Sequence, residues 1–325
     1  MFTLSQLLDL INAYLSEELE HDRSPRNLYE PVNYVLAVGG KRIRPVLLMM
    51  AYNLYKDDVS NILSCATAIE MYHNYTLLHD DLMDRADMRR GKKTVHRVWD
   101  DNTAILSGDA MLVLAYQYIC SSNPEHLKEI LDLFSFTALQ ICEGQQLDMD
   151  FELRCDVTEN EYIEMIRLKT AVLLAASLKI GAILGGGSKK DSDLLYNVGL
   201  YTGLAFQLKD DLLDVYGDPV VFGKKNGGDI LCNKKTFLLI KSLEIADDHQ
   251  SFELNKWINA SSYIPEEKII AVKNIYDEIE IKGLCEKKIS FYYEKALDSL
   301  SKITPIAQRR ERLEDLIRVL MLREV

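Results

Sequence analysis

Asp80-Asp81-Leu82-Met83-Asp84, preceded by Leu77-Leu78, is the stretch of sequence most informative about the fold. Its spacing fits a helix, because at about 100° per residue the first and fifth positions lie only about 40° apart. Asp80 and Asp84 are therefore predicted to project from one face, with Asp81 at its edge. The apolar residues before them indicate a helix packed inside the protein, so we expect the carboxylates to line an internal cavity.

The same pattern occurs again at Asp210-Asp211-Leu212-Leu213-Asp214, after Leu204 and Phe206. Carboxylates about 6 Å apart repel by about 3 kcal/mol at an effective dielectric of about 20, so two converging clusters need divalent cations between them. Mg²⁺ is suitable, because it takes oxygen ligands and shares carboxylates with substrate phosphates. A lone cluster is more typical of a solvated acidic helix face, but two copies in apolar helices favour a metal site.

Helical patterns cover most of the chain, which predicts an all-α fold. Sixteen glycines and seven prolines in 325 residues are few for a protein of many turns, and 48% apolar residues can fill a sizeable core. The length allows one large domain or two modest ones. The predicted helices cover residues 2–20, 28–37, 43–56, 59–85, 102–120, 125–150, 159–185, 190–216, 235–246, 266–299 and 305–323.

Targeting and redox signals are weak. The stretch 170–187 is weakly polar, but Lys179 interrupts it and Gly181 breaks it, so we expect a buried helix ending at the glycines 185–187 and no membrane span. Residues 1–20 lack a basic lead and a cleavage site, which predicts an amphipathic helix and not a signal peptide. Six scattered cysteines without a CxxC pair indicate thiols in a reducing compartment, so we expect the cytoplasm.

The net charge of −12 argues against nucleic acid as a partner. An acidic protein binds phosphates only through local cations, and three segments supply them. Residues 39–45 hold three cations at a helix start that is expected to open at Pro45. Residues 88–96 and 217–233 are basic, glycine-containing loops, and each follows an aspartate cluster directly.

Single residues in these segments are less specific. Arg89 and Arg90 are adjacent, so they point in different directions and suit two different phosphates. Lys169 amid apolar neighbours is usually a snorkelling side chain. His73 lies two helical turns before Asp80, where a lone histidine is more often a hydrogen-bonded core residue than a ligand.

Taken together, the motifs resemble the trans-isoprenyl diphosphate synthase (polyprenyl synthetase) family, which includes farnesyl and geranylgeranyl diphosphate synthases. The resemblance runs in order over residues 35 to 240. It rests on Gly40-Lys41-Arg42-x-Arg44, His73 with Asp80-Asp81-x-x-Asp84, Arg89-Arg90-Gly91, Gly144-Gln145 with Asp148, Lys169-Thr170, Phe206-Gln207-Leu208-Lys209-Asp210-Asp211-x-x-Asp214 and the Gly223-Lys224 loop.

The resemblance implies a single all-α domain over residues 1–325, a helical bundle around a deep central cavity, usually a homodimer. It implies Mg²⁺-dependent condensation of isopentenyl diphosphate with an allylic diphosphate (dimethylallyl, geranyl or farnesyl). The implied direct metal ligands are Asp80, Asp84 and Asp210, with Asp81, Asp211 and Asp214 acting mainly through water. The implied isopentenyl diphosphate ligands are Lys41, Arg44, His73 and Arg90. The implied allylic diphosphate ligands are Arg89, Lys169, Lys224 and Lys234. Thr170, Gln145 and Gln207 would steady the allylic cation.

The sequence departs from the family at Asn233, where many relatives have glycine, and at Leu238, where many have proline. Lys235 therefore stays an alternative to Lys234. Some relatives have a basic C-terminal end, and Arg323 matches it only weakly. The rival hypotheses are a non-catalytic subunit of a longer-chain synthase, a terpene cyclase and a metal-free helical scaffold. The 41–44 block and the second cluster argue against a terpene cyclase, and the presence of both clusters argues against a non-catalytic subunit. Magnesium-dependent bisphosphonate binding would separate the scaffold from the other hypotheses.

Product length depends on what blocks the cavity below the first cluster. Tyr75 lies five residues before Asp80, about 7.5 Å down the helix axis, and Tyr72 lies deeper. Either tyrosine could instead be core packing, an alternative that weighs evenly against the product-length role for Tyr72 and less for Tyr75. In the family, an aromatic residue at the Tyr75 position followed by the small Thr76 resembles short-chain synthases, which implies a C15–C20 product, with C20 slightly favoured.

Overall fold

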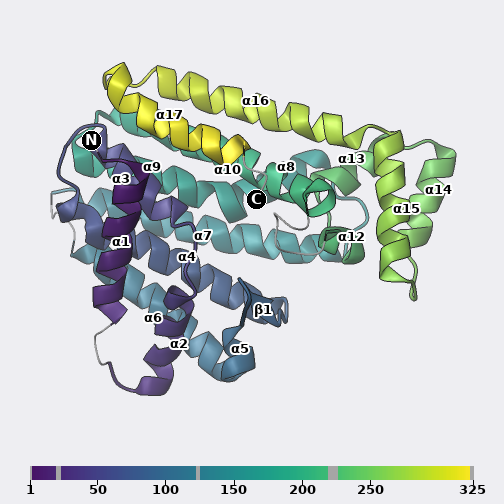
Figure 1. The fold of residues 1–325 in the computed structure, drawn as a ribbon, viewed down its shortest axis with the longest axis horizontal. Coiled ribbons are helices and arrows are strands. Elements are labelled where there is room, and N and C mark those ends of the chain that lie inside the picture. The colour runs from purple at the N-terminus through teal and green to yellow at the C-terminus, as the bar shows by residue number, and fades with distance from the viewer. Residues whose placement is uncertain (1, 20–22, 122–124, 219–225, 323–325) are drawn as a thin grey trace. The chain divides into compact units, whose positions relative to one another are not determined.

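The computed structural model describes all residues except 1, 20–22, 122–124, 219–225 and 323–325. Within these residues the all-α prediction is confirmed, since the strands β1 (Met88–Arg89) and β2 (Lys92–Lys93) form the only sheet. The helices are α1 (Leu4–Leu19), α2 (Arg26–Ala37), α3 (Ile43–Asn53), η1 (Ser60–Ile62), α4 (Leu63–Met83), α5 (Val95–Val98), α6 (Asp101–Cys120), α7 (Leu127–Glu152), α8 (Glu159–Ile166), η2 (Arg167–Ala171), α9 (Val172–Gly185), α10 (Lys189–Tyr216), α12 (Gly228–Leu231), α13 (Phe237–Ile245), α14 (Asp248–Ile258), α15 (Pro265–Glu278), α16 (Ile281–Ser301) and α17 (Ala307–Leu322) (Figure 1).

The chain divides into two compact units, and neither is a continuous stretch. Unit 1 contains Met1–Phe136, Ala176–Tyr196 and Ile303–Leu313. Unit 2 contains Thr137–Ala175, Asn197–Lys302 and Glu314–Val325. The first aspartate cluster belongs to unit 1 and the second to unit 2. A single domain over residues 1–325 stays a prediction.

Helix α4 is the centre of unit 1, where it packs against α1, α2, α3 and α6. Its residues 65–72 are all buried, as are residues 45–53 of α3. Helices that are apolar on every side belong in a core, because no face is suited to water. The last turn of α4, which carries the first aspartate cluster, is therefore anchored by a well-packed helix.

Unit 2 is organised around α13 and α15. Residues 237–240 of α13 are buried, and this helix packs on α8 and α16. Helix α15 packs on α12, α14 and α16. These contacts hold the short α12 and the loop that follows it, where Lys234 lies.

Three details of the helix prediction differ from the structure. The helix expected over 266–299 is two helices, because Glu280 adopts a left-handed conformation (φ 55°) between α15 and α16. Helix α14 was not predicted, although Asp247 and Gln250 form a capping box at its start. Helix α3 begins at Ile43, as the predicted range 43–56 has it, and not at Pro45. The proline lies in the first turn, where an amide hydrogen has no helical partner.

In the part of the chain that the structure describes, two helical stretches are long and apolar enough to cross a membrane, Asp101–Cys120 and Glu159–Gly185. In the second, 83% of the most apolar window is buried inside the protein, and α9 ends at Gly185. The predicted buried helix is thus confirmed. In the first, only 39% is buried, because Ile105, Leu106 and Val113 lie on an exposed face.

Candidate active site

The first aspartate cluster forms the end of α4. Asp84 is the C-cap and keeps helical angles (φ −78°, ψ −5°), and its amide donates to the Asp80 carbonyl at 2.8 Å. Asp80 and Asp84 therefore stay one turn apart, as predicted. Asp81 is buried, and both of its oxygens accept from Arg89 Nε at 2.8 Å. Asp81 thus holds a predicted substrate ligand in place.

Arg89 and Arg90 point in different directions, as predicted. They lie at the turn between β1 and β2, where Arg90 (φ 50°) and Gly91 (φ 74°) both adopt the left-handed conformation of a two-residue hairpin turn. Arg90 donates to the Gly39 carbonyl. A β-carbon on Gly40 would lie 2.6 Å from Arg90 Nη1 and would displace the guanidinium, and the Gly40 backbone (φ 147°) itself favours glycine.

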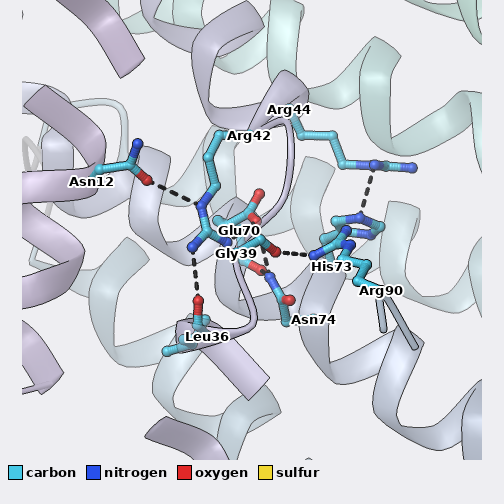
Figure 2. A network of polar contacts seen from close by, with 9 residues as sticks. All are labelled: Asn12, Leu36, Gly39, Arg42, Arg44, Glu70, His73, Asn74 and Arg90. Atoms are coloured by element: carbon cyan, nitrogen blue, oxygen red, sulfur yellow. Dashed lines mark hydrogen bonds and ion pairs between the residues drawn. The ribbon is translucent and has the colours of Figure 1, made fainter. Parts of the chain in front are cut away.

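A buried ion pair orders the 39–44 loop (Figure 2). Arg42, in the left-handed conformation (φ 48°), donates to Glu70 at 2.7 Å and to the Leu36 carbonyl at 2.8 Å. Asn74 donates to the same Glu70 carboxylate at 3.0 Å. Such a conformation costs a non-glycine residue about 1–2 kcal/mol, so the network must over-determine it. The consequence is that Arg42 is directed inward while Lys41 is exposed.

Arg44 and His73 meet, as their shared predicted role requires. Arg44 Nη1 lies 3.0 Å from His73 Nε2 (Figure 2). Because guanidinium only donates, His73 accepts and carries its proton on Nδ1. Burial, and then the cations Arg44 and Arg90, hold the pKa of His73 well below its usual value. His73 is therefore neutral at pH 7.

This electrostatic setting predicts an acid-sensitive fold. Below about pH 6.5 the unfolded chain binds a proton at His73 that the folded chain excludes, so stability falls by up to about 1.4 kcal/mol per pH unit from this residue. Urea unfolding of the protein and of His73→Gln between pH 5 and 8 measures it. We expect a shallower pH slope in the variant; identical slopes would contradict the prediction.

The second aspartate cluster lies near the end of α10 in unit 2. Asp211 is buried and accepts from the Tyr162 hydroxyl and from Gln207 Nε2 at 3.0 Å. Burial, and then the Asp229 carboxylate, raise the pKa of Asp211 to about 7, against the opposing effect of Lys234. Asp214 accepts from the Asp229 amide at 3.0 Å. Asp210 and Asp214 are half-buried on one face, so the predicted spacing holds here too.

Tyr162 was missed by sequence reasoning. It is buried at the start of α8, and burial followed by the Asp211 charge raise the pKa of Tyr162 well above its usual value. It therefore stays protonated and donates to Asp211. Its position one residue after the Thr158–Glu161 capping box predicts a helix start, but nothing local indicates its partner.

Lys169 and Thr170 lie in η2, a π-helical turn inside the long apolar helix. Such wide turns are frequent at functional sites. Lys169 pairs with Asp148 at 2.6 Å, so the snorkelling interpretation is replaced by an ion pair. Thr170 donates to Gln207 Oε1 at 3.1 Å. Gly144 permits this arrangement, since a β-carbon there would lie 2.3 Å from the Lys169 amide nitrogen.

Gln145 holds an oxygen without a donor. Its Oε1 is buried, and no hydrogen-bond partner for it exists in the part of the chain that the structure describes. An unsatisfied buried acceptor costs about 1–3 kcal/mol, which a bound positive charge would offset. The predicted role facing an allylic cation suits this atom.

Of the predicted allylic diphosphate ligands, Lys234 is described by the structure and Lys224 is not. Lys224 lies outside the described residues, as does Arg323. Lys234 lies close enough to lower the pKa of the Asp211 carboxyl, whereas Lys235 donates to the Asn233 carbonyl at 3.1 Å. Lys234 is therefore the better candidate of the adjacent pair.

The predicted product-length residues belong to an aromatic cluster. Tyr72 is fully buried with its ring 5.1 Å from that of Phe134 and 5.4 Å from that of Tyr75. Tyr75 and Thr76 are only half-buried, and the Tyr75 ring lies 4.8 Å from that of His79. Tyr72 thus packs in the core beneath Tyr75.

The donor sets suit Mg²⁺. The side chains that face one way in each cluster are carboxylates, and oxygen-only sets with room for water and phosphate oxygens are what Mg²⁺ binds. Among the described residues, no group of three or more acidic, histidine or cysteine side chains is gathered around one point. Each cluster alone offers an incomplete shell, which substrate oxygens and water would complete.

An all-α fold with two aspartate clusters on apolar helices, and a cation next to each, is typical of isoprenoid synthases. The polyprenyl synthetase family model matches residues 25–279, and the chain belongs to this family. A geranylgeranyl diphosphate synthase of Methanosarcina mazei is 42% identical over 236 residues, 72% of each chain. A geranylfarnesyl diphosphate synthase of Natronomonas pharaonis is 40% identical, over 73% of this chain and 74% of its own. A crystal structure of a geranylgeranyl pyrophosphate synthase covers 100% of both chains with a TM-score of 0.94 and 42% identity. The predicted family and fold class are confirmed.

Proposed function

We propose that this protein is a magnesium-dependent prenyltransferase that joins isopentenyl diphosphate head-to-tail to an allylic diphosphate and releases pyrophosphate. One observation carries the proposal: each cluster presents two carboxylates one helical turn apart, with a cation beside it. That cation is Arg89 at the first cluster and Lys234 at the second. The prenyltransferase class agrees with the family to which the chain belongs.

Asp80, Asp84 and Asp210 are proposed to hold Mg²⁺, with Arg89, Lys169, Lys224 and Lys234 on the allylic diphosphate. When bound, the metal would neutralise the charge that develops on the departing pyrophosphate. Arg89 and Lys169 are each held by a carboxylate, Asp81 and Asp148, and cations fixed in this way would need little reorganisation in the transition state.

The organic cation left behind needs neutral oxygens around it. Gln145 Oε1 supplies a buried acceptor without a donor, and the Thr170 hydroxyl is oriented by Gln207. These dipoles stabilise a cation without forming a covalent bond to it. Lys41, Arg44, His73 and Arg90 are proposed to hold isopentenyl diphosphate, whose double bond attacks the cation. The proton then lost passes to pyrophosphate, which is close and basic.

Incubation of the purified protein with isopentenyl diphosphate and dimethylallyl, geranyl or farnesyl diphosphate tests the proposal, with products identified by mass spectrometry. A product in the C15–C20 range is expected, with C20 favoured. A non-catalytic subunit of a longer-chain synthase, the alternative function, would give none with any primer.

Tyr75→Ala is expected to lengthen the product by at least one C5 unit. In the proposal, the half-buried Tyr75 ring blocks the growing chain about 7.5 Å from Asp80 along the helix axis, and alanine removes that block. Tyr72→Ala should instead lower stability by about 3–5 kcal/mol, since it removes a fully buried aromatic ring. Mass spectrometry of products and urea unfolding separate the two. An unchanged product from Tyr75→Ala would remove Tyr75 as the floor.

A homodimer in the cytoplasm is the proposed working form. The exposed face of α6 carries Ile105, Leu106 and Val113, which are 44%, 59% and 57% exposed. Apolar side chains gathered on one helix face favour association. Sedimentation equilibrium at micromolar protein measures the state directly.

A further inference from the structure

Lys268, on α15, is a buried lysine with an unusual set of partners. It is only 1% exposed. Its ammonium donates to Asn233 Oδ1 at 2.7 Å and to the Leu231 carbonyl at 3.3 Å, and it lies 4.3 Å from the centre of the Tyr263 ring. Within the described residues it forms no ion pair with a carboxylate. Burial accordingly lowers the pKa of Lys268.

A buried lysine without an ion pair contributes little to the free energy of folding. A desolvated ammonium costs several kcal/mol unless strong partners offset it, and apolar residues of similar volume often replace buried charges without loss. Its three partners are neutral: Asn233 lies in the loop between α12 and α13, and Leu231 is the last residue of α12, where that loop begins. The contacts therefore indicate a role in fixing that loop.

Asn233 is the residue that the contacts fix. Its backbone adopts the left-handed conformation (φ 53°), which asparagine tolerates better than most residues. Its side chain is held at both ends, since Oδ1 accepts from Lys268 and Nδ2 donates to the Ile258 carbonyl at 3.0 Å. Glycine would adopt this conformation freely, but it would leave the Lys268 ammonium without its shortest contact.

The next residue is Lys234, and its backbone is held on both sides. Its amide donates to the Asp229 carbonyl at 2.9 Å, and its carbonyl accepts from the Thr236 amide at 2.8 Å. The left-handed turn at Asn233 thus sets the direction from which the Lys234 side chain approaches the second aspartate cluster. Asp229 in turn donates its own amide to the Asp214 carboxylate at 3.0 Å, so the backbone of Lys234 is joined to the second aspartate cluster through one residue.

We propose that Lys268 and Asn233 are positioning residues that aim Lys234 at the allylic diphosphate. This inference rests on the proposed function, in which Lys234 binds that diphosphate. It accounts for asparagine at position 233, because the side-chain hydrogen bonds of Asn233 to Lys268 and to the Ile258 carbonyl fix the conformation of the turn. Neither residue touches the substrate.

The test compares Lys268→Met, Asn233→Gly and the double variant with Lys234→Ala. Lys295→Met is the matched control, because Lys295 also lies over an aromatic ring, 4.4 Å from the centre of Phe291. KM for the allylic and for the isopentenyl substrate, the calorimetric Kd for geranyl diphosphate with Mg²⁺, and the urea midpoint are measured for each.

Each single variant is expected to raise KM and Kd for the allylic diphosphate about tenfold, because a displaced side chain loses its oriented contact. KM for isopentenyl diphosphate should stay within about twofold of the parent value, a split that a general loss of packing would not give. In the double variant, KM and Kd for the allylic diphosphate should be no higher than in the weaker-binding single variant, because both substitutions remove the same Lys268–Asn233 hydrogen bond. Lys295→Met should match the parent.

Two results would overturn the inference, and they are distinguishable. If Lys234→Ala leaves the allylic KM unchanged, the assignment of Lys234 in the proposed function fails and the inference fails with it. If Lys234→Ala raises that KM but Lys268→Met and Asn233→Gly do not, the positioning role alone is wrong. Should Lys268→Met not fold, Asn233→Gly decides the question by the same criteria.

Discussion

Asp80→Ala and Asp210→Ala are each expected to lower kcat by about 10³-fold, equivalent to about 4 kcal/mol of transition-state stabilisation. The physical reason is that each removes a proposed metal ligand from a cluster that offers only two carboxylates on one face. Steady-state rates of pyrophosphate release at saturating substrates measure the effect. The urea midpoint should change little, because Asp80 and Asp210 are half-buried and lie at the ends of their helices.

Asp87→Ala is the matched control for the first cluster. Asp87 lies three residues after Asp84, is exposed, and pairs only at the surface with Arg97 at 2.7 Å. Its removal should leave kcat within about twofold, since exposed ion pairs contribute about 0–1 kcal/mol. Full activity in either Asp80→Ala or Asp210→Ala would contradict the metal-ligand assignment.

Glu70→Ala is expected to cost about 3–5 kcal/mol of folding free energy. The Glu70 side chain is 2% exposed and its Arg42 partner 6%, so the change leaves a buried guanidinium without its counter-charge. Asn74 loses an acceptor as well. Equilibrium urea unfolding measures the cost.

The double variant Arg42→Met, Glu70→Leu distinguishes the effect of the two charges from the effect of the volume that their side chains fill. Removing both charges avoids the unpaired guanidinium, so most of the stability should return. Affinity for isopentenyl diphosphate should not return, because the left-handed conformation at Arg42 that places Lys41 and Arg44 is then no longer fixed. Equal stability of Glu70→Ala and the parent would contradict the account of this loop.

Local patterns in the sequence were sufficient to predict the helices that carry the chemistry. The spacing of Asp80 and Asp84 holds because it depends only on helical geometry, and the buried stretch to Gly185 follows from its continuous apolar character. The break at Glu280 was not predictable in the same way, because a left-handed residue in a charged, helix-favouring stretch has no local signature.

Partners distant in sequence were also beyond local reasoning. Tyr162 reaches Asp211 from another helix, and Lys268 reaches Asn233 across 35 residues. Both contacts depend on how helices pack, which the periodicity of one segment does not encode. The departure from glycine at Asn233 could be noticed from the sequence, but its compensation by Lys268 required the structure.

Calorimetric titration with a bisphosphonate, with and without Mg²⁺, tests the central claim most directly, namely that the aspartate clusters bind diphosphate through metal. We predict tight binding with Mg²⁺, no measurable binding in EDTA, and at least about tenfold weaker binding in Asp80→Ala and Asp210→Ala. Equal binding by the parent protein in Mg²⁺ and in EDTA would contradict the account.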